Sequence, residues 1–145
     1  MKTIFNRPFF VVALSCGLFL SSCASGPSYA EIQSTLPSIP KGKGRVFVYR
    51  PTAFGAAVKP NVMIDQNIVG KSVGRGFFYT DQPTGSHEIS IKTEMTHKNT
   101  VTVQSGKPSF VKCSITPGLL VAHVLPNQVD QATGNSEIQN CKLAK

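Results

Sequence analysis

Between residues 45 and 125 the chain is a succession of short strand-like runs separated by turn signals. Residues 45–50 (RVFVYR) are apolar on both faces and rich in β-branched and aromatic side chains, which is typical of a central strand. Residues 86–94 alternate between an apolar and a polar face, as a strand with one wet side does. Because no helix-length segment separates these runs, the pattern indicates a sandwich or barrel and excludes a parallel α/β sheet.

Six further runs have strand character, and one of them ends in a hydrophobic stretch. Gln66-Asn67 is predicted as the turn of a hairpin, and residues 119–125 are predicted as a buried strand, with a partner-binding loop edge at 117–120 as the alternative. The runs are 61–65, 68–72, 76–80, 99–104, 109–116 and 119–125. We therefore expect an all-β antiparallel sandwich of about seven to eight strands.

The C-terminal residues have a different pattern. Asn135 or Ser136 is the expected N-cap of a short helix that runs through Ile138 and Cys141. The predicted fold is thus a sandwich with a short C-terminal helix.

The first 22 residues are predicted to be a signal peptide. Lys2 and Arg7 give a positive start, and residues 9–20 form a mostly apolar run. As a helix this run would span about 18 Å, which is short of the roughly 30 Å hydrocarbon core of a bilayer. A secretory leader is therefore favoured over a membrane span.

Residues 20–23 (LSSC) resemble a bacterial lipobox. The resemblance implies that Cys23 carries lipid and becomes the first residue of the mature protein; two or three acyl chains anchor a protein stably where one does not. Ala24, which takes the place of an inner-membrane retention Asp, implies the outer membrane. The alternative is an ordinary secretory peptide with an incidental cysteine.

Residues 23–44 are predicted to be a lipidated cysteine and tether, followed by a sandwich domain at 45–145. Residues 24–44 are rich in Pro, Gly and Ser and could reach about 70 Å when fully extended. Tyr29, Ile32 and Leu36 have helical spacing, so part of the segment is expected to dock as a short helical turn.

Two cysteines are left after Cys16 is assigned to the leader and Cys23 to lipid. A Cys113–Cys141 disulfide is predicted for an oxidising compartment, with a stabilisation of at most about 3.5 kcal/mol. The alternative is a pair of buried free thiols. No metal site is expected, since the chain lacks a CxxC pair and its histidines lack ligand spacing.

The chain is basic, with a formal net charge of +8. Removal of Lys2 and Arg7 with the leader leaves 13 basic against 7 acidic residues, dispersed along the chain. In an envelope compartment, anionic headgroups, lipopolysaccharide or cell-wall polymer fit this charge better than nucleic acid, for which no recognition motif is present. The alternative is a basic surface that only maintains solubility.

One catalytic motif occurs by spacing alone. Residues 70–74 match G-x-S-x-G around Ser72, but no helix is predicted to follow, so a nucleophile elbow is not expected. A hydrolase would lose activity on Ser72→Ala or His87→Ala, and we expect neither to reveal one. The aromatic run 77–79 is predicted to be core and not a sugar platform, His87 and His123 to be hydrogen-bonded core histidines, and His97 to be solvated.

The order of several elements resembles an uncharacterised family of small bacterial lipoproteins with a PEGA-like sandwich domain. The resemblance covers residues 42–143 and includes residues 48–51 (VYRP), Phe78-Tyr79 and the Pro83-x-Gly85-x-His87 pattern. It implies an immunoglobulin-like or transthyretin-like sandwich on a lipid anchor, and it implies no activity.

Together these features predict a non-enzymatic outer-membrane lipoprotein that acts as an interaction module in the cell envelope without a cofactor. Its expected partners are the membrane and an envelope protein, cell-wall polymer or anionic lipid. The candidate interaction loop contains Arg50, Pro51, Phe54 and Lys59. An accessory subunit of a secretion or envelope assembly is the second candidate.

Overall fold

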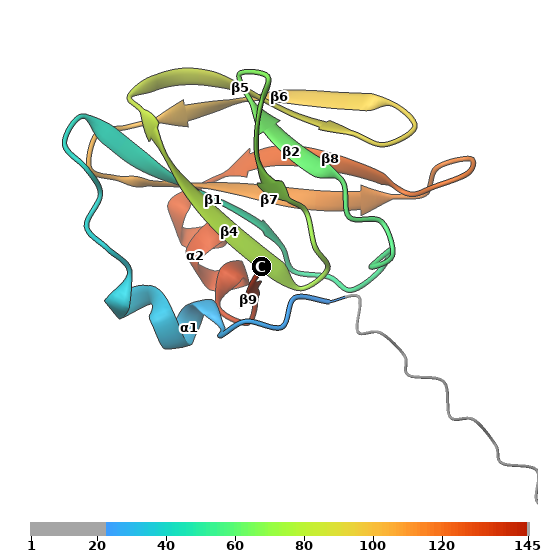
Figure 1. The fold of residues 1–145 in the computed structure, drawn as a ribbon, viewed down its shortest axis with the longest axis horizontal. Helices are drawn as coiled ribbons and strands as arrows, with labels where there is room; N and C mark the ends of the chain where they lie inside the picture. Colours follow the sequence, from blue (N-terminus) through green and yellow to red (C-terminus); the bar gives the residue numbers. More distant parts are fainter. Residues whose placement is uncertain (1–22, 145) are drawn as a thin grey trace, which may run out of the picture.

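Residues 23–144 are described by a computed structural model, and the predicted signal peptide lies outside them. They form nine strands in two stacked sheets (Figure 1). The strands are β1 (Lys43–Arg50), β2 (Asn61–Ile64), β3 (Asn67–Lys71), β4 (Gly76–Pro83), β5 (Gly85–Lys92), β6 (Thr96–Val103), β7 (Pro108–Thr116), β8 (His123–Val129) and β9 (Lys142–Leu143). One sheet has the order β8-β7-β1-β4-β9 and the other β3-β2-β5-β6.

The predicted all-β sandwich is confirmed, and two of its strand pairs are parallel. β1 pairs antiparallel with β4 but parallel with β7, and β4 pairs parallel with β9. The chain leaves the five-stranded sheet after β4, forms β5 and β6 in the other sheet, and returns as β7 in the direction of β1. The sandwich is therefore mostly antiparallel, with parallel pairing at this crossover and at β9.

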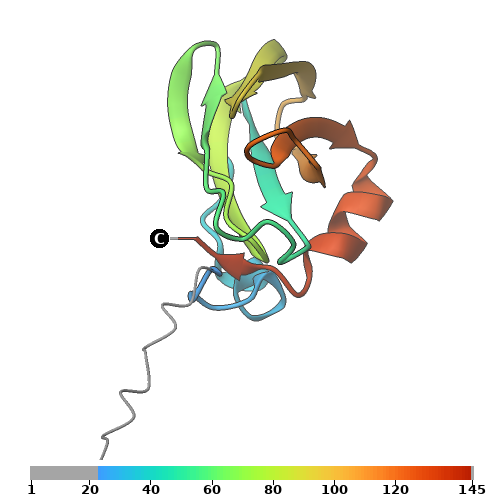
Figure 2. The same cartoon turned by 90° about the vertical axis from the view of Figure 1, so that its right-hand side faces the viewer.

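The central strand β1 is buried on both faces, as predicted. Val46 and Val48 lie in the core between the sheets, while Phe47 and Tyr49 lie in a second cluster on the outer face of the five-stranded sheet. That outer face is covered by α1 (Tyr29–Ile32), the 3-10 turn Gln33–Thr35 and α2 (Gln131–Ile138) (Figure 2). The predicted core assignment of the aromatic run also holds for Phe77 and Phe78, which belong to the outer and inter-sheet clusters respectively.

Three predicted boundaries are wrong by one residue or more. The β2–β3 turn is formed by Asp65 and Gln66, which both have positive φ, one residue earlier than predicted. The helix α2 begins after Asp130, whose carboxylate accepts the N–H of Thr133 at 2.9 Å, so residues 135 and 136 lie inside it. Residues 119–122 are loop and not strand, because β8 pairs with β7 only from His123 onward.

The predicted Cys113–Cys141 disulfide is not formed, and the prediction is wrong. Both thiols are free and buried. Alternation along β7 places Cys113 in the core between the sheets, whereas Cys141 follows α2 and lies in the cluster on the opposite face of the same sheet. Burial raises the pKa of each thiol to about 11.

The segment expected to be a tether is docked on the domain. The N–H groups of Ala24 and Gly26 donate to the carbonyls of Gly74 and Leu143, both at 3.2 Å. Tyr29, in the expected helical turn, packs edge-on against Phe47 in the outer cluster. In both views the blue start of the described chain lies beside β9 (Figures 1 and 2). Within residues 23–144, no helix has the length and apolar character that crossing a bilayer requires.

Candidate functional site

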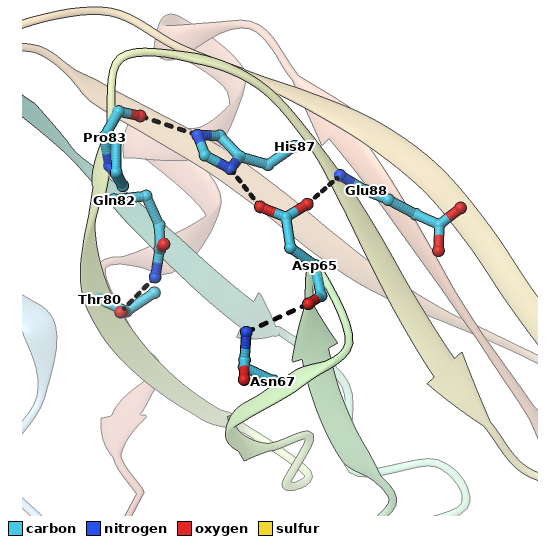
Figure 3. Close-up of polar contacts among 7 residues, drawn as sticks. All are labelled: Asp65, Asn67, Thr80, Gln82, Pro83, His87 and Glu88. Carbon is cyan, nitrogen blue, oxygen red and sulfur yellow. Dashed lines mark hydrogen bonds and ion pairs between the residues drawn. The ribbon is translucent and has the colours of Figure 1, made fainter.

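His87 and Asp65 form a hydrogen-bonded pair of the kind found in a Ser-His-Asp catalytic triad (Figure 3). His87 Nδ1 lies 2.6 Å from Asp65 Oδ2, and Nε2 lies 2.8 Å from the carbonyl oxygen of Pro83. Since both neighbours are acceptors, the geometry suits the imidazolium form, which donates from both nitrogens. The hydrogen bond to Asp65 raises the pKa of His87, and the same bond lowers the pKa of Asp65.

This pair is built to hold turns together. Asp65 belongs to the β2–β3 turn and also accepts the N–H of Glu88 at 3.0 Å, while Pro83 ends β4 before the next hairpin turn. Both ring nitrogens of His87 are occupied, so no lone pair is free to take a proton from a substrate. The Pro83-x-Gly85-x-His87 pattern is therefore explained as a hairpin whose histidine ties its own turn to a neighbouring one.

Ser72, at the centre of the G-x-S-x-G match, does not contact this pair. It is buried, and its hydroxyl has no hydrogen-bond partner among residues 23–144. A nucleophile needs a base within hydrogen-bonding reach, and His87 bonds elsewhere. The structure therefore does not assemble the residues of this motif into a catalytic arrangement.

A second polar cluster joins α2 to the five-stranded sheet. The Tyr49 hydroxyl donates to Glu137 at 2.6 Å, and the Lys112 ammonium lies 2.6 Å from the other oxygen of the same carboxylate. Burial and the bond to Glu137 raise the pKa of Tyr49. These residues are 88 and 25 positions apart, so no local sequence signal pointed to the cluster.

Arg50 was expected in an interaction loop, and the structure corrects this. Its side chain is fully buried, and its guanidinium donates to the carbonyls of Phe54 and Val58 at 2.7 and 2.8 Å. Arg50 thus fixes the backbone of the 51–60 loop from its buried side. Of the other predicted residues in this loop, Phe54 and Lys59 are exposed and Pro51 is half-buried.

Phe54 is part of a larger group of exposed apolar side chains at one end of the sandwich. Leu119 and Leu120 are 93% and 86% exposed, and Phe54 and Met95 are more than half exposed. The loops that carry them lie next to one another. A Cβ at Gly55, beside Phe54, would meet Ile115 and Ala122 within 3.5 Å. Glu94, beside Met95, accepts hydrogen bonds from the 119–121 backbone. We call this set, Phe54, Met95, Leu119 and Leu120, the apolar edge.

Glu94 fixes the most exposed part of the apolar edge. Its carboxylate accepts the N–H groups of Leu119, Leu120 and Val121, at 3.1 Å for Leu119 and 2.9 Å for Val121. These bonds, with one from His123, lower the pKa of Glu94. The loop that follows Pro117-Gly118 is therefore held in one conformation although its side chains face water.

The histidines behind this loop form a chain. His123 Nε2 lies 3.0 Å from Glu94, and its Nδ1 lies 2.9 Å from Nε2 of His97. His123 was predicted to be a hydrogen-bonded core histidine; the hydrogen bonds are present, but the residue is half-buried and outside both core clusters. His97 is also half-buried and not fully solvated as expected. No group of three His, Cys, Asp or Glu side chains within 23–144 is arranged to hold a metal ion.

The described surface has several small hollows. A polar one of about 240 Å³ lies where β6, β7 and β8 meet the start of α2, and an apolar one of about 340 Å³ lies beside β3 and Phe78. Two more, of about 250 and 240 Å³, flank Cys23. Cys23, the predicted lipidation site, is partly exposed at the point where the docked segment begins.

The two stacked sheets make this chain a small β-sandwich protein. Residues 40–125 match the profile of a family described as "Protein of unknown function (DUF2846)", and the chain belongs to this family. It is also similar to an uncharacterized protein of Haemophilus influenzae, with 28% identity over 149 residues, covering 99% of this chain and 87% of the relative. No solved structure matches the chain.

The family match does not include the helices that cover the outer face of the five-stranded sheet. Strands β1 to β7 lie inside residues 40–125, whereas α1, α2 and β9 lie outside this range. The second core cluster, which contains Tyr29, Ile138 and Cys141, is therefore completed by the two segments that flank the match.

Proposed function

We propose that this chain is a lipoprotein held at the outer membrane by acyl chains on Cys23, and that its sandwich is a non-catalytic interaction module of the cell envelope. The lipobox resemblance of residues 20–23 supports the anchor. The resemblance to PEGA-type sandwiches supports a sandwich domain on a lipid anchor, and it is part of this proposal. The position of Cys23 at the surface of the domain is compatible with a bulky modification there.

The apolar edge is the observation that carries the interaction role. Small soluble domains seldom present clustered aliphatic side chains to water unless the patch has a function. Here the backbone beneath them is fixed by Glu94 and, under Phe54, by Arg50. A preorganised loop loses little entropy on binding, so the fixed backbone favours binding.

The chemistry of the edge favours a protein partner over a polysaccharide. Leu119, Leu120 and Met95 offer no hydrogen-bonding side-chain groups, which sugar recognition needs. Apolar and aromatic side chains at the centre of a patch are typical of protein interfaces. We therefore place the contact with an envelope protein at this edge.

Photo-crosslinking in intact cells tests the interaction role. A photoreactive residue at Leu119 is expected to give a discrete protein adduct, which Leu120→Asp in the same chain abolishes. The control position is Lys107, an exposed residue at the opposite end of β1 from Arg50. A multi-protein adduct would narrow the role to an accessory subunit of an envelope or secretion assembly. Adducts with lipid alone, or equal adducts from both positions, would contradict a protein contact.

Intact-mass analysis of the protein from host membranes tests the anchor. We expect a chain that begins at Cys23 and carries the mass of a diacylglyceryl group and a further acyl chain. An unmodified Cys23 contradicts the anchor and leaves the interaction role of the edge open to the crosslinking result.

A further inference from the structure

The polypeptide around Cys23 is fixed to the domain. Cys23 forms an isolated β-bridge with Gly74. The chain from Ala24 to Pro27 lies beside β9, where the Leu143 N–H donates to the Pro27 carbonyl at 2.8 Å. The backbone of Lys142 forms a β-bridge with Ser28 and is the partner of Gly76 in the β4–β9 strand pair. A group attached to the Cys23 sulfur is therefore held at the surface of the sandwich, with no free tether between them.

Four basic residues surround this point. The hollow on one side of Cys23 is lined by Lys59 and Lys71, and the hollow on the other side by Arg75 and Lys142. All four side chains are exposed. They come from four separate parts of the chain: the 51–60 loop, the end of β3, the turn before β4, and β9.

These cations are not neutralised by close carboxylates. Within residues 23–144, none of the four lies within 4 Å of an acidic side chain; the ion pairs formed there involve other basic residues, Arg45, His87, Lys98, Lys112 and His123. The charge of Lys142 also acts on Glu31, whose pKa is lowered chiefly by hydrogen bonds from Ser28 and to a smaller extent by Lys142. The surface around Cys23 is thus positively charged.

We propose that Lys59, Lys71, Arg75 and Lys142 form a basic collar that binds the phosphates of anionic phospholipid headgroups around the lipidated Cys23. The occupant follows from charge complementarity and position, since acyl chains on Cys23 place headgroups next to these four side chains. The sandwich then lies directly on the bilayer in one orientation, in contrast to a domain on a flexible tether. This inference rests on the proposed lipidation of Cys23.

Lysine footprinting on vesicles tests the collar. The full protein, purified from host membranes, is placed in vesicles of phosphatidylcholine with or without phosphatidylglycerol and treated with a water-soluble acetylating reagent. Acetylation of Lys59, Lys71 and Lys142 is expected to slow by about fivefold in the anionic vesicles, and less at high salt, because screening weakens the contact. Lys98, on β6 and paired with Glu88, is expected to react equally in both.

Charge reversal provides the matched variants. Lys71→Glu with Arg75→Glu is expected to remove the protection of Lys59 and Lys142 while the protein still sediments with vesicles through its lipid. Lys41→Glu with Lys107→Glu makes the same charge change near the start of β1, at the other end of the sandwich, and is expected to leave the protection intact.

The outcomes separate the collar from the anchor. Lipid-bearing protein whose collar lysines react equally in both vesicles overturns the collar and leaves the anchor standing. Equal loss of protection in both double variants also overturns the collar, because it shows a dependence on net charge alone. An unmodified Cys23 in the intact-mass measurement overturns the anchor on which the inference rests.

Discussion

The backbone N–H of Ala24 donates to the carbonyl of Gly74 at 3.2 Å, which joins the start of the described chain to the turn before β4. Because residue 23 is next to this bond and forms a β-bridge with Gly74, its backbone has a fixed place relative to β4. The same segment continues along β9 and ends in α1, which covers the outer core cluster. The position of the predicted lipidation site is thus part of the fold.

Gly26→Ala is expected to loosen this docked segment. A Cβ at this position would overlap the carbonyl oxygen of Leu143, so the two backbones must separate. We expect a loss of stability of about 1–3 kcal/mol, typical of overpacking, and faster hydrogen exchange at Tyr29, whose N–H is bonded to Cys141. Ser25→Ala, at an exposed neighbour, serves as control. Unchanged exchange at Tyr29 in Gly26→Ala would contradict the docking.

Arg50→Lys is expected to release the 51–60 loop. A lysine lacks the planar fork with which Arg50 reaches the carbonyls of Phe54 and Val58 together, so one acceptor loses its partner. Chemical denaturation should show a loss of about 1–3 kcal/mol, as for a buried acceptor left without its hydrogen bond. The matched control is Arg75→Lys, since Arg75 is exposed. Equal stability of the two variants would disprove the role of Arg50 as a clamp.

Glu94→Gln is expected to free the loop that carries Leu119 and Leu120. The neutral amide is a weaker acceptor than the carboxylate, so backbone amides 119–121 should exchange severalfold faster and proteolysis at Leu119 should accelerate. In the unmodified protein, hydrogen bonds from Val121 and His123 keep the pKa of Glu94 below 4.5. The loop is therefore held above this pH and is released as the pH falls through the lowered pKa. Protection that persists in Glu94→Gln would show that other contacts hold the loop.

The Asp65–His87 pair predicts a pH window for stability. The pKa of His87 is raised above 6.5, so its contribution is complete below that pH and is lost as the pH rises through the raised value. The pKa of Asp65 is lowered below 3.8, so its contribution is present above 3.8 and is lost as the pH falls through the lowered value. The pair therefore stabilises most between these limits.

Asp65→Asn tests this window through the melting temperature as a function of pH. Inside the window the variant should be less stable by about 1–2 kcal/mol, in the range of a charge-assisted hydrogen bond that is partly exposed. Above pH 6.5 its stability should fall much less with rising pH than that of the unmodified protein. Glu88→Gln removes a neighbouring carboxylate without touching the pair and should keep that decline. The same decline in Asp65→Asn would assign the pH dependence to another group.

Cys113 and Cys141 are expected to be free thiols that do not react in the folded protein. Both are buried, and burial raises the pKa of each to about 11, so little thiolate is present at neutral pH. Alkylation without reductant should label neither residue in the native state and both after denaturation. Mass spectrometry that finds Cys113 and Cys141 joined after denaturation would contradict the separation of these residues on opposite faces of the sheet.

Most of the fold could be predicted from periodicity. The alternation of residues 86–94 and the doubly apolar run 45–50 correspond to β5 and β1, because the side-chain period of a strand is set by the backbone alone. The boundary errors have two causes, a local helix cap and a distant strand partner. Asp130 starts α2 because its carboxylate reaches Thr133. The run 119–125 is partly loop because β8 pairs with β7 only from residue 123 onward.

The candidate sites also divide into features that could be predicted from the sequence and features that depend on the folded chain. The sandwich class, the basic charge and the lipobox resemblance at Cys23 could all be recognised without a structure. The packing of the folded chain was needed to place Cys113 and Cys141 on opposite faces of one sheet and to bury Arg50. It also brings four basic residues together around Cys23. The physical reason is that periodicity is local, whereas the pairing of β4 with β9 and the docking of residues 23–28 depend on hydrogen bonds between residues far apart in the chain.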